Sequence, residues 1–287
     1  MKKTAIYQRK RPDSPRWLNK WIQSLPWFFG FVLAVFGCLV IFVVNATTGR
    51  IHPGNAWGLG YGIGATVALV AVLLYTVRRR TMKLRPPGRA WTYLQVHVYG
   101  GGIFLLLMLM HTGFRIPSGI HTWWLWLISL WVVGSGVLGI VIQKWIPTVL
   151  SAGLAVEVHY DRVPELIEHI RTRSEKIVAS ADERLREFYE SRVAPSLVAP
   201  EPRLMYFIDI TGGIHARIKP FEYLRALLPA SDQESLDELK KLFNTKLEID
   251  AHYTLQRVLR TWLILHVPIS MVLVVLLFIH IFSVLYY

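Results

Sequence analysis

The chain has 287 residues, of which 53% are hydrophobic and 18% charged, and its formal net charge is +13 at pH 7. Many strongly basic proteins bind nucleic acid, but in those proteins the positive charge gathers on a soluble face, whereas here it flanks long apolar stretches, which excludes that class. The single cysteine, Cys38, lies within the first of these stretches, so internal disulfides and cysteine-ligated iron–sulfur clusters are also excluded.

Five stretches contain no Asp, Glu, Lys or Arg, and each is long enough to cross a bilayer as a helix, which takes about 20 apolar residues. They are residues 27–49, 57–77, 91–114, 116–143 and 261–287. The sequence therefore predicts an all-α membrane protein with five transmembrane helices. It begins with a basic arm (1–26), continues through four spans (27–143) and a long insertion (144–260), and closes on the fifth span (261–287).

Positive charge is distributed unevenly around the spans and predicts their orientation. Most basic residues near span ends fall in the N-terminal arm and in the connection after the second span: Lys2, Lys3, Arg9, Lys10, Arg11, Arg16, Lys20, Arg78, Arg79, Arg80, Lys83, Arg85 and Arg89. Only Arg50 and Arg115 lie at the opposite ends of these spans. By the positive-inside rule, the N-terminus and the insertion face the cytoplasm and the C-terminus faces the exterior, as expected in a bacterial inner membrane.

The insertion has too much apolar patterning to be a disordered linker, and its acidic and basic residues nearly balance. Residues 163–193 place apolar side chains at helical spacing among charged ones, which predicts an amphipathic helix. The insertion is therefore expected to fold into a mostly helical layer on the cytoplasmic side.

Two further elements are predicted later in the insertion. Residues 205–210 and 214–218 flank Thr211-Gly212-Gly213, a pattern typical of a short hairpin around a glycine turn. The run Ser231-Asp232-Gln233-Glu234 has the spacing of a capping box, which predicts that a helix begins there and runs into the fifth span.

Four histidines lie within two spans and share one internal spacing. His97 and His111 are in the third span, His266 and His280 are in the fifth, and no charged residue lies between the members of either pair. A separation of fourteen residues brings both rings to roughly one face of a helix, about 21 Å apart along its axis. Because an ionisable side chain at bilayer depth is costly, it is by default functional. We expect haem iron as the partner, in two haems at two levels of the membrane.

The predicted orientation decides which histidines share a haem. The third and fifth spans run in the same direction, so His97 should pair with His266 at the cytoplasmic level and His111 with His280 at the exterior level. Two imidazoles on opposite faces of a porphyrin complete a six-coordinate iron, which suits electron transfer. The chain has no C-x-x-C-H motif, so both groups are expected to be non-covalent haem b.

Other residues near these histidines are candidates for haem contact. Gly101 and Gly113 follow the two histidines of the third span and would let a flat ring approach the backbone, although contact between helices is the alternative explanation for both. Arg89 and Arg260 at the cytoplasmic level, and Arg115 at the exterior level, are the expected counter-charges for haem propionates.

The two equally spaced histidine pairs resemble the dihaem cytochrome b membrane subunits of respiratory and photosynthetic complexes, over roughly residues 90–145 and 260–287. The resemblance implies that the four histidines are axial ligands, that electrons cross the bilayer between a quinone pool and partner redox proteins, and that a quinone site lies near one haem. Implied partners, besides membrane lipid, are a cytoplasmic iron–sulfur or flavoprotein subunit and an exterior cytochrome c subunit. The insertion departs from the family pattern. We expect it to dock a cytoplasmic redox subunit, with a lid over the haem edge as the alternative.

Other functions predict different patterns. Ferric reductases also carry paired histidines on two helices, but a flavin and nicotinamide domain follows their last span, and the insertion here lacks a G-x-G-x-x-G fingerprint. A carrier of that kind would need a separate cytoplasmic flavoprotein. A membrane di-iron enzyme would use histidines three or four residues apart, and this chain has none. A haem-free scaffold or transporter would leave four imidazoles without partners in the membrane.

Overall fold

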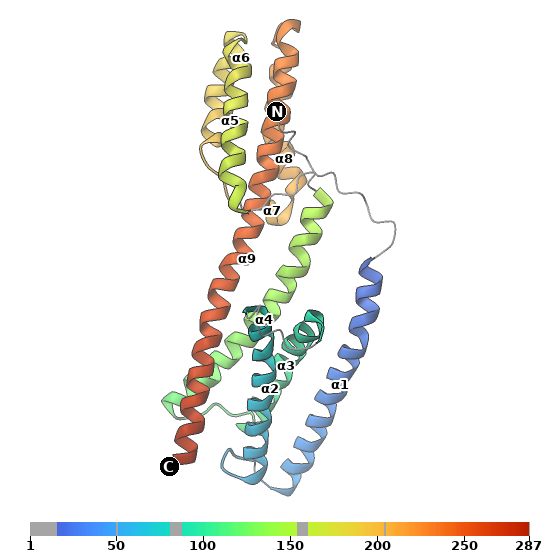
Figure 1. Ribbon diagram of the computed structural model, residues 1–287, viewed down its shortest axis with the longest axis vertical. Coiled ribbons are helices and arrows are strands. Elements are labelled where there is room, and N and C mark those ends of the chain that lie inside the picture. Colours follow the sequence, from blue (N-terminus) through green and yellow to red (C-terminus); the bar gives the residue numbers. More distant parts are fainter. Residues whose placement is uncertain (1–15, 50, 81–87, 154–159, 204, 287) are drawn as a thin grey trace. The chain divides into compact units, whose positions relative to one another are not determined.

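The computed structural model describes residues 16–49, 51–80, 88–153, 160–203 and 205–286, and within these ranges it is helical with no strand (Figure 1). The chain divides into two compact units. The span unit comprises Tyr7–Leu138 and Leu265–Tyr287, and the insertion unit comprises Gly139–Ile264. Both boundaries fall inside long helices.

Five helices are long and apolar enough to cross a membrane, as predicted. They are α1 (Arg16–Thr48), α2 (Ala56–Arg80), α3 (Ala90–His111), α4 (Ile120–Gly153) and α9 (Gln233–Tyr286). A helix of 54 residues such as α9 is about 80 Å long, far more than the roughly 30 Å of bilayer hydrocarbon. Only the uncharged part of α9, from Thr261 onward, therefore forms the fifth span.

The core of the span unit is formed where α2 packs against α3 and where both meet α4 and the end of α9. Its buried side chains are Ala65, Leu69, Phe104, Met108 and Leu273. A second cluster joins α1 to the same pair of helices around Tyr61 and Met110. There the Asn45 side-chain amide donates a 2.6 Å hydrogen bond to the Tyr61 hydroxyl, which satisfies a polar group that would be costly to bury alone. Most other large side chains of the spans are apolar and exposed, as expected of surfaces that face lipid.

The insertion unit packs α5 (Val163–Ala179), α6 (Glu183–Phe188) and α8 (Ile210–Arg225) around the N-terminal part of α9 (Figure 1). Its core is aliphatic and aromatic, with Leu185, Leu239 and Leu247 fully buried. The predicted helix over residues 163–193 is present but interrupted between α5 and α6. Asp182 is the N-cap at which the helix α6 begins, since its carboxylate accepts a hydrogen bond from the Arg184 backbone N–H at 2.8 Å.

The predicted hairpin is wrong. Residues 205–218 form the short helix α7 (Met205–Ile208) and the first half of α8. The Asp209 side chain caps α8 by accepting the Gly212 backbone N–H at 2.8 Å, so Thr211-Gly212-Gly213 is a helical first turn and not a β-turn. A Cβ on Gly212 would lie 2.1 Å from a carboxylate oxygen of Asp209, which explains the glycine. The predicted helix into the fifth span is correct, and it begins at Gln233 after a 3₁₀ turn (Ala230–Asp232).

Candidate functional site

Both histidines of α3 are held by backbone carbonyl oxygens of α2. The Nδ1 atom of His97 lies 3.1 Å from the carbonyl oxygen of Val72, and Nδ1 of His111 lies 2.8 Å from that of Gly58. The two acceptors are also fourteen residues apart, so an antiparallel α2 repeats the spacing of the histidines. A carbonyl oxygen only accepts hydrogen bonds, so the nitrogen facing it carries the proton and the other nitrogen, Nε2, presents its lone pair.

Glycines at the contact between α2 and α3 make this arrangement possible. A Cβ on Gly62 would lie 2.9 Å from Nδ1 of His111, and a Cβ on Gly100 would lie 3.0 Å from a methyl group of Val72. Both positions are tighter than ordinary side-chain packing allows, so glycine is needed for the two backbones to approach. The approach is what brings the carbonyl oxygens of α2 within hydrogen-bond distance of the imidazoles.

His266 of α9 is buried and is oriented by a serine of α4. Its Nδ1 lies 2.8 Å from the Ser135 hydroxyl, and that hydroxyl lies 3.0 Å from the carbonyl oxygen of Val132, to which it donates. When the single hydroxyl hydrogen is directed to the Val132 carbonyl, Ser135 accepts a hydrogen bond from Nδ1 of His266. His266 then has the same tautomer as His97 and His111, with Nε2 available as a ligand.

The structure places His111 beside His280, as the predicted pairing requires, and it places His97 within electrostatic range of His266. The ring centroids of His111 and His280 are 6.3 Å apart, and the ring planes are inclined at 79°. His97 and His266 are close enough to interact electrostatically. The C-terminal part of α9 thus lies parallel to α3, with one pair of imidazoles toward each end of α3.

A third ring joins the pair formed by His111 and His280, and the sequence alone did not indicate it. His121, the second residue of α4, stacks on His280 with a centroid distance of 6.2 Å and an interplanar angle of 25°. Its Nε2 atom is buried and has no hydrogen-bond partner within the described part of the chain. The sequence pattern suggested only a polar ring at the membrane interface, where such nitrogens are ordinarily solvated.

Two glycines expected to face a haem differ in their surroundings. A Cβ on Gly101 would meet no atom within 4 Å, so open space lies beside α3 one turn after His97. Gly113, in contrast, ends α3 with a φ of +61°, and a Cβ there would be 2.9 Å from the Ile51 carbonyl oxygen. Gly113 therefore has a backbone reason to be glycine that requires no cofactor.

The three arginines expected near propionates lie outside the packed core. Arg89 precedes α3 and Arg115 follows it, and both side chains are exposed. In the insertion unit, Arg260 donates a 3.0 Å hydrogen bond to Asp161 and lies 3.9 Å above the Tyr160 ring. Arg89 and Arg115 remain candidates for charge-assisted bonds to a propionate, whereas Arg260 would have to share its charge with Asp161.

The histidine pairs suit some metal groups and not others. Among the described residues no cluster of three or more His, Cys, Asp or Glu side chains is placed to hold a metal ion, so the histidine pairs are the sites to consider. Structural and catalytic zinc sites take at least three protein ligands, which the pairs do not supply. In a haem the porphyrin supplies the ring ligands of the iron, and the protein needs to supply only two further ligands. Two imidazoles on opposite sides of one metal ion have centroids roughly 6 Å apart, since each metal–nitrogen bond is about 2 Å, and the His111–His280 separation fits this value.

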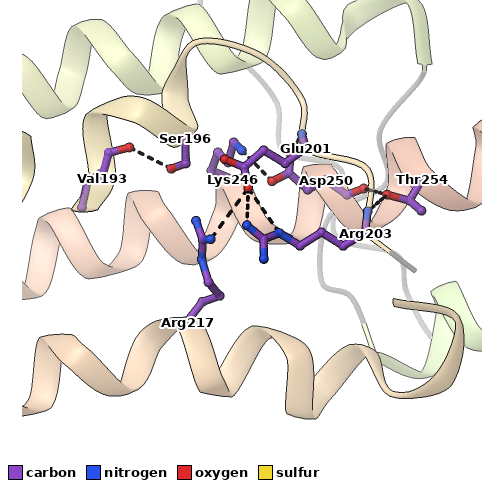
Figure 2. Close-up of polar contacts among 8 residues, drawn as sticks. All are labelled: Val193, Ser196, Glu201, Arg203, Arg217, Lys246, Asp250 and Thr254. Atoms are coloured by element: carbon purple, nitrogen blue, oxygen red, sulfur yellow. Dashed lines mark hydrogen bonds and ion pairs between the residues drawn. The ribbon is translucent and has the colours of Figure 1, made fainter. Parts of the chain in front are cut away.

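A second polar site lies in the insertion unit and involves no candidate ligand (Figure 2). Lys246 and Asp250, one turn apart on α9, form an ion pair with 2.6 Å between Nζ and Oδ2, and both side chains are fully buried. Burial raises the pKa of Asp250 to about 6, and the adjacent ammonium of Lys246 opposes that rise. The other carboxylate oxygen accepts the Glu201 backbone N–H at 3.1 Å, and the Thr254 hydroxyl accepts that of Arg203 at 3.3 Å. The pair therefore helps to fasten an extended segment to α9.

Comparison with models of known protein families, with curated proteins and with solved structures finds no match to this chain.

Proposed function

We propose that the chain is a dihaem b-type cytochrome, a membrane subunit that transfers electrons across the bilayer between a quinone pool and partner redox proteins. The observation that carries this proposal is the repeated arrangement in the span unit. At each level an imidazole of α3 is fixed through Nδ1 by a carbonyl of α2. His111 lies beside His280 of α9, and His97 is within electrostatic range of His266. Histidines that ligate a metal are commonly fixed in this way by a hydrogen bond from the nitrogen that does not bind the metal.

The chemistry of these residues favours an electron carrier over a catalyst. Each pair of neutral imidazoles would hold one haem iron, and a haem held by two histidines would supply one-electron transfer without an open position for substrate. The residues of this chain would set the ligand field, exclude water and bury the group among apolar side chains. The fourteen residues between the levels correspond to about 21 Å, a large part of the roughly 30 Å hydrocarbon thickness.

The proposal is tested first by haem content. The full chain, purified in detergent and reduced with dithionite, should show a b-type spectrum, and the pyridine haemochrome assay should give two haems per polypeptide. Because no thioether bond is expected, acidified organic solvent should extract both groups. A colourless protein or a ratio near one would reject the two-level model, and haem that stays with the polypeptide after extraction would reject non-covalent binding.

We propose further that the insertion unit docks a cytoplasmic redox subunit, either an iron–sulfur protein or a flavoprotein, and that an exterior cytochrome c subunit can serve the other haem. The insertion unit has its own core of buried aliphatic and aromatic side chains, which supports a docking role. Replacing residues 165–245 with a short flexible linker should preserve both haems and abolish co-purification of the partner. Loss of the cytoplasmic-side haem with the partner still bound would instead favour a lid.

A further inference from the structure

The two rings of the exterior pair are fixed by different means. His111 is held by its hydrogen bond to the Gly58 carbonyl and by its close approach to Gly62. For His280 the structure shows no hydrogen bond within the described residues, and its ring contacts His111 on one hand and His121 on the other. The orientation of the His280 plane therefore depends on packing rather than on a hydrogen bond.

The angles show which neighbour the His280 plane follows. It is nearly perpendicular to the ring of His111, at 79°, and nearly parallel to the ring of His121, at 25°. Neighbouring rings of this kind adopt preferred mutual angles, so a change in the plane of one ring alters its contact with the other. His121 is thus the neighbour with which the His280 plane is aligned, whereas the ring of His111 is nearly perpendicular to it.

The position of His121 is not that of an ordinary interfacial histidine. A ring at the membrane surface usually keeps one nitrogen in contact with water or headgroups, but Nε2 of His121 is shielded and has no partner among the described residues. Burying a nitrogen in this way costs free energy, so the stacked position must be stabilised by something else. The contact with His280 is the interaction that the structure provides.

We propose that His121 is a positioning residue that sets the plane of the His280 imidazole, and thereby the angle between the two axial ligands of the exterior-side haem. The inference rests on the proposed dihaem function. Residues that do not bind the metal themselves commonly orient metal-bound histidines, and in doing so they alter the redox potential of the metal. In low-spin ferric centres with two imidazoles, near-perpendicular ligand planes give a large maximal g value, and the value falls as the planes become parallel.

The experiment compares His121→Leu, His121→Phe and His52→Leu in the full chain, with haem content measured beside the electron paramagnetic resonance spectrum of the oxidised protein. His121→Leu removes the flat ring, His121→Phe keeps a flat ring without nitrogens, and His52 is an exposed histidine outside the cluster. All three variants should keep two haems. In His121→Leu the lowest-field line of one haem should move to higher field, and the midpoint potential of that haem should change. His121→Phe and His52→Leu should retain the wild-type line.

Each alternative result identifies what has failed. A wild-type spectrum in His121→Leu, or the same shift in His121→Phe, would overturn the positioning role while leaving the dihaem function intact. Loss of one haem in both His121 variants would also overturn it, because His121 would then act through a nitrogen. A wild-type preparation without haem would refute the proposed function itself, and this is read before any variant is compared.

Discussion

The imidazole of His111 lies against Gly62 so closely that a Cβ at position 62 would be 2.9 Å from Nδ1. The ring cannot retreat easily, because its hydrogen bond to the Gly58 carbonyl, one turn earlier on α2, draws it toward the same helix. This contact links the close packing of two spans to the orientation of one candidate ligand. It also offers a way to disturb a single level of the membrane without replacing a histidine.

Gly62→Ala should therefore weaken the exterior site alone. Forcing a methyl group into a packed interior costs about 1–3 kcal/mol, and here the displaced group is the His111 ring. The haem content should fall from two toward one per chain, with the cytoplasmic-side component unchanged in the reduced spectrum. Gly60→Ala is the matched control, since a Cβ on Gly60 meets nothing within 4 Å. Equal loss in both variants would show that the helix, rather than the ring, is sensitive.

Single alanine replacements of the four candidate ligands should sort into two classes. His97→Ala and His266→Ala should remove one and the same haem component, and His111→Ala and His280→Ala should remove the other, because the structure places these residues as two pairs. Redox titration of each variant resolves the components, and His52→Ala serves as the control that retains both. If His97→Ala and His280→Ala abolished the same component, the parallel arrangement of α3 and α9 would be wrong.

The sequence was sufficient to predict the spans and the pairing of the histidines, because both depend on features that lie along the chain. Uncharged stretches mark the spans, and their alternation along the chain makes the third and fifth parallel, while the assignment of one side to the cytoplasm stays a prediction. Ser135, His121 and the carbonyls of Val72 and Gly58 could not be found in this way. Their roles depend on which face of α2 or α4 meets the histidines, and a helix that is apolar on all sides carries no such information.

The failed hairpin has a different origin. Asp209 stands three residues before Gly212, which is the spacing of an N-cap side chain and the backbone N–H that it accepts. The sequence supports that reading as well as it supports a glycine turn between two strands. The glycine pattern was interpreted as a turn because it separates two short apolar runs, and only tertiary packing of α8 against α5 and α9 decides for the helix.

The buried pair in the insertion unit should behave differently when one partner is removed than when both are. Asp250→Leu leaves the Lys246 ammonium buried without its partner, which should cost about 3–5 kcal/mol of unfolding free energy. Lys246→Met should also destabilise the unit, and in either single variant the remaining group can become neutral, since burial raises the pKa of Asp250 and lowers the pKa of Lys246. The double replacement should recover most of the loss, because two apolar side chains then fill the site.

Pulse proteolysis of the full chain across a urea series measures these differences in the insertion unit. The exposed pair Arg171 and Glu175 on α5 provides the control, and its removal should leave the urea midpoint unchanged. Additive losses in the Lys246 and Asp250 variants, with no recovery in the double replacement, would contradict a mutual dependence of the two side chains.

Asp250 should also make the stability of the insertion unit depend on pH in a direction opposite to that of carboxylates whose pKa is lowered by an ion pair. Its pKa is raised by burial to about 6, above the ordinary value of about 4 that it regains on unfolding. Between these values the folded chain binds a proton that the unfolded chain lacks, so the contribution of Asp250 to stability is fully present below pH 4 and is lost as the pH rises through 6.

Asp250→Asn removes this titration and keeps the shape of the side chain. The unfolding free energy of the wild type relative to Asp250→Asn should therefore increase as the pH is lowered from 7 to 4.5, measured by the same proteolysis assay. A difference that stays level, or that decreases toward acid, would mean that the Lys246 ammonium outweighs burial and keeps Asp250 ionised throughout this range.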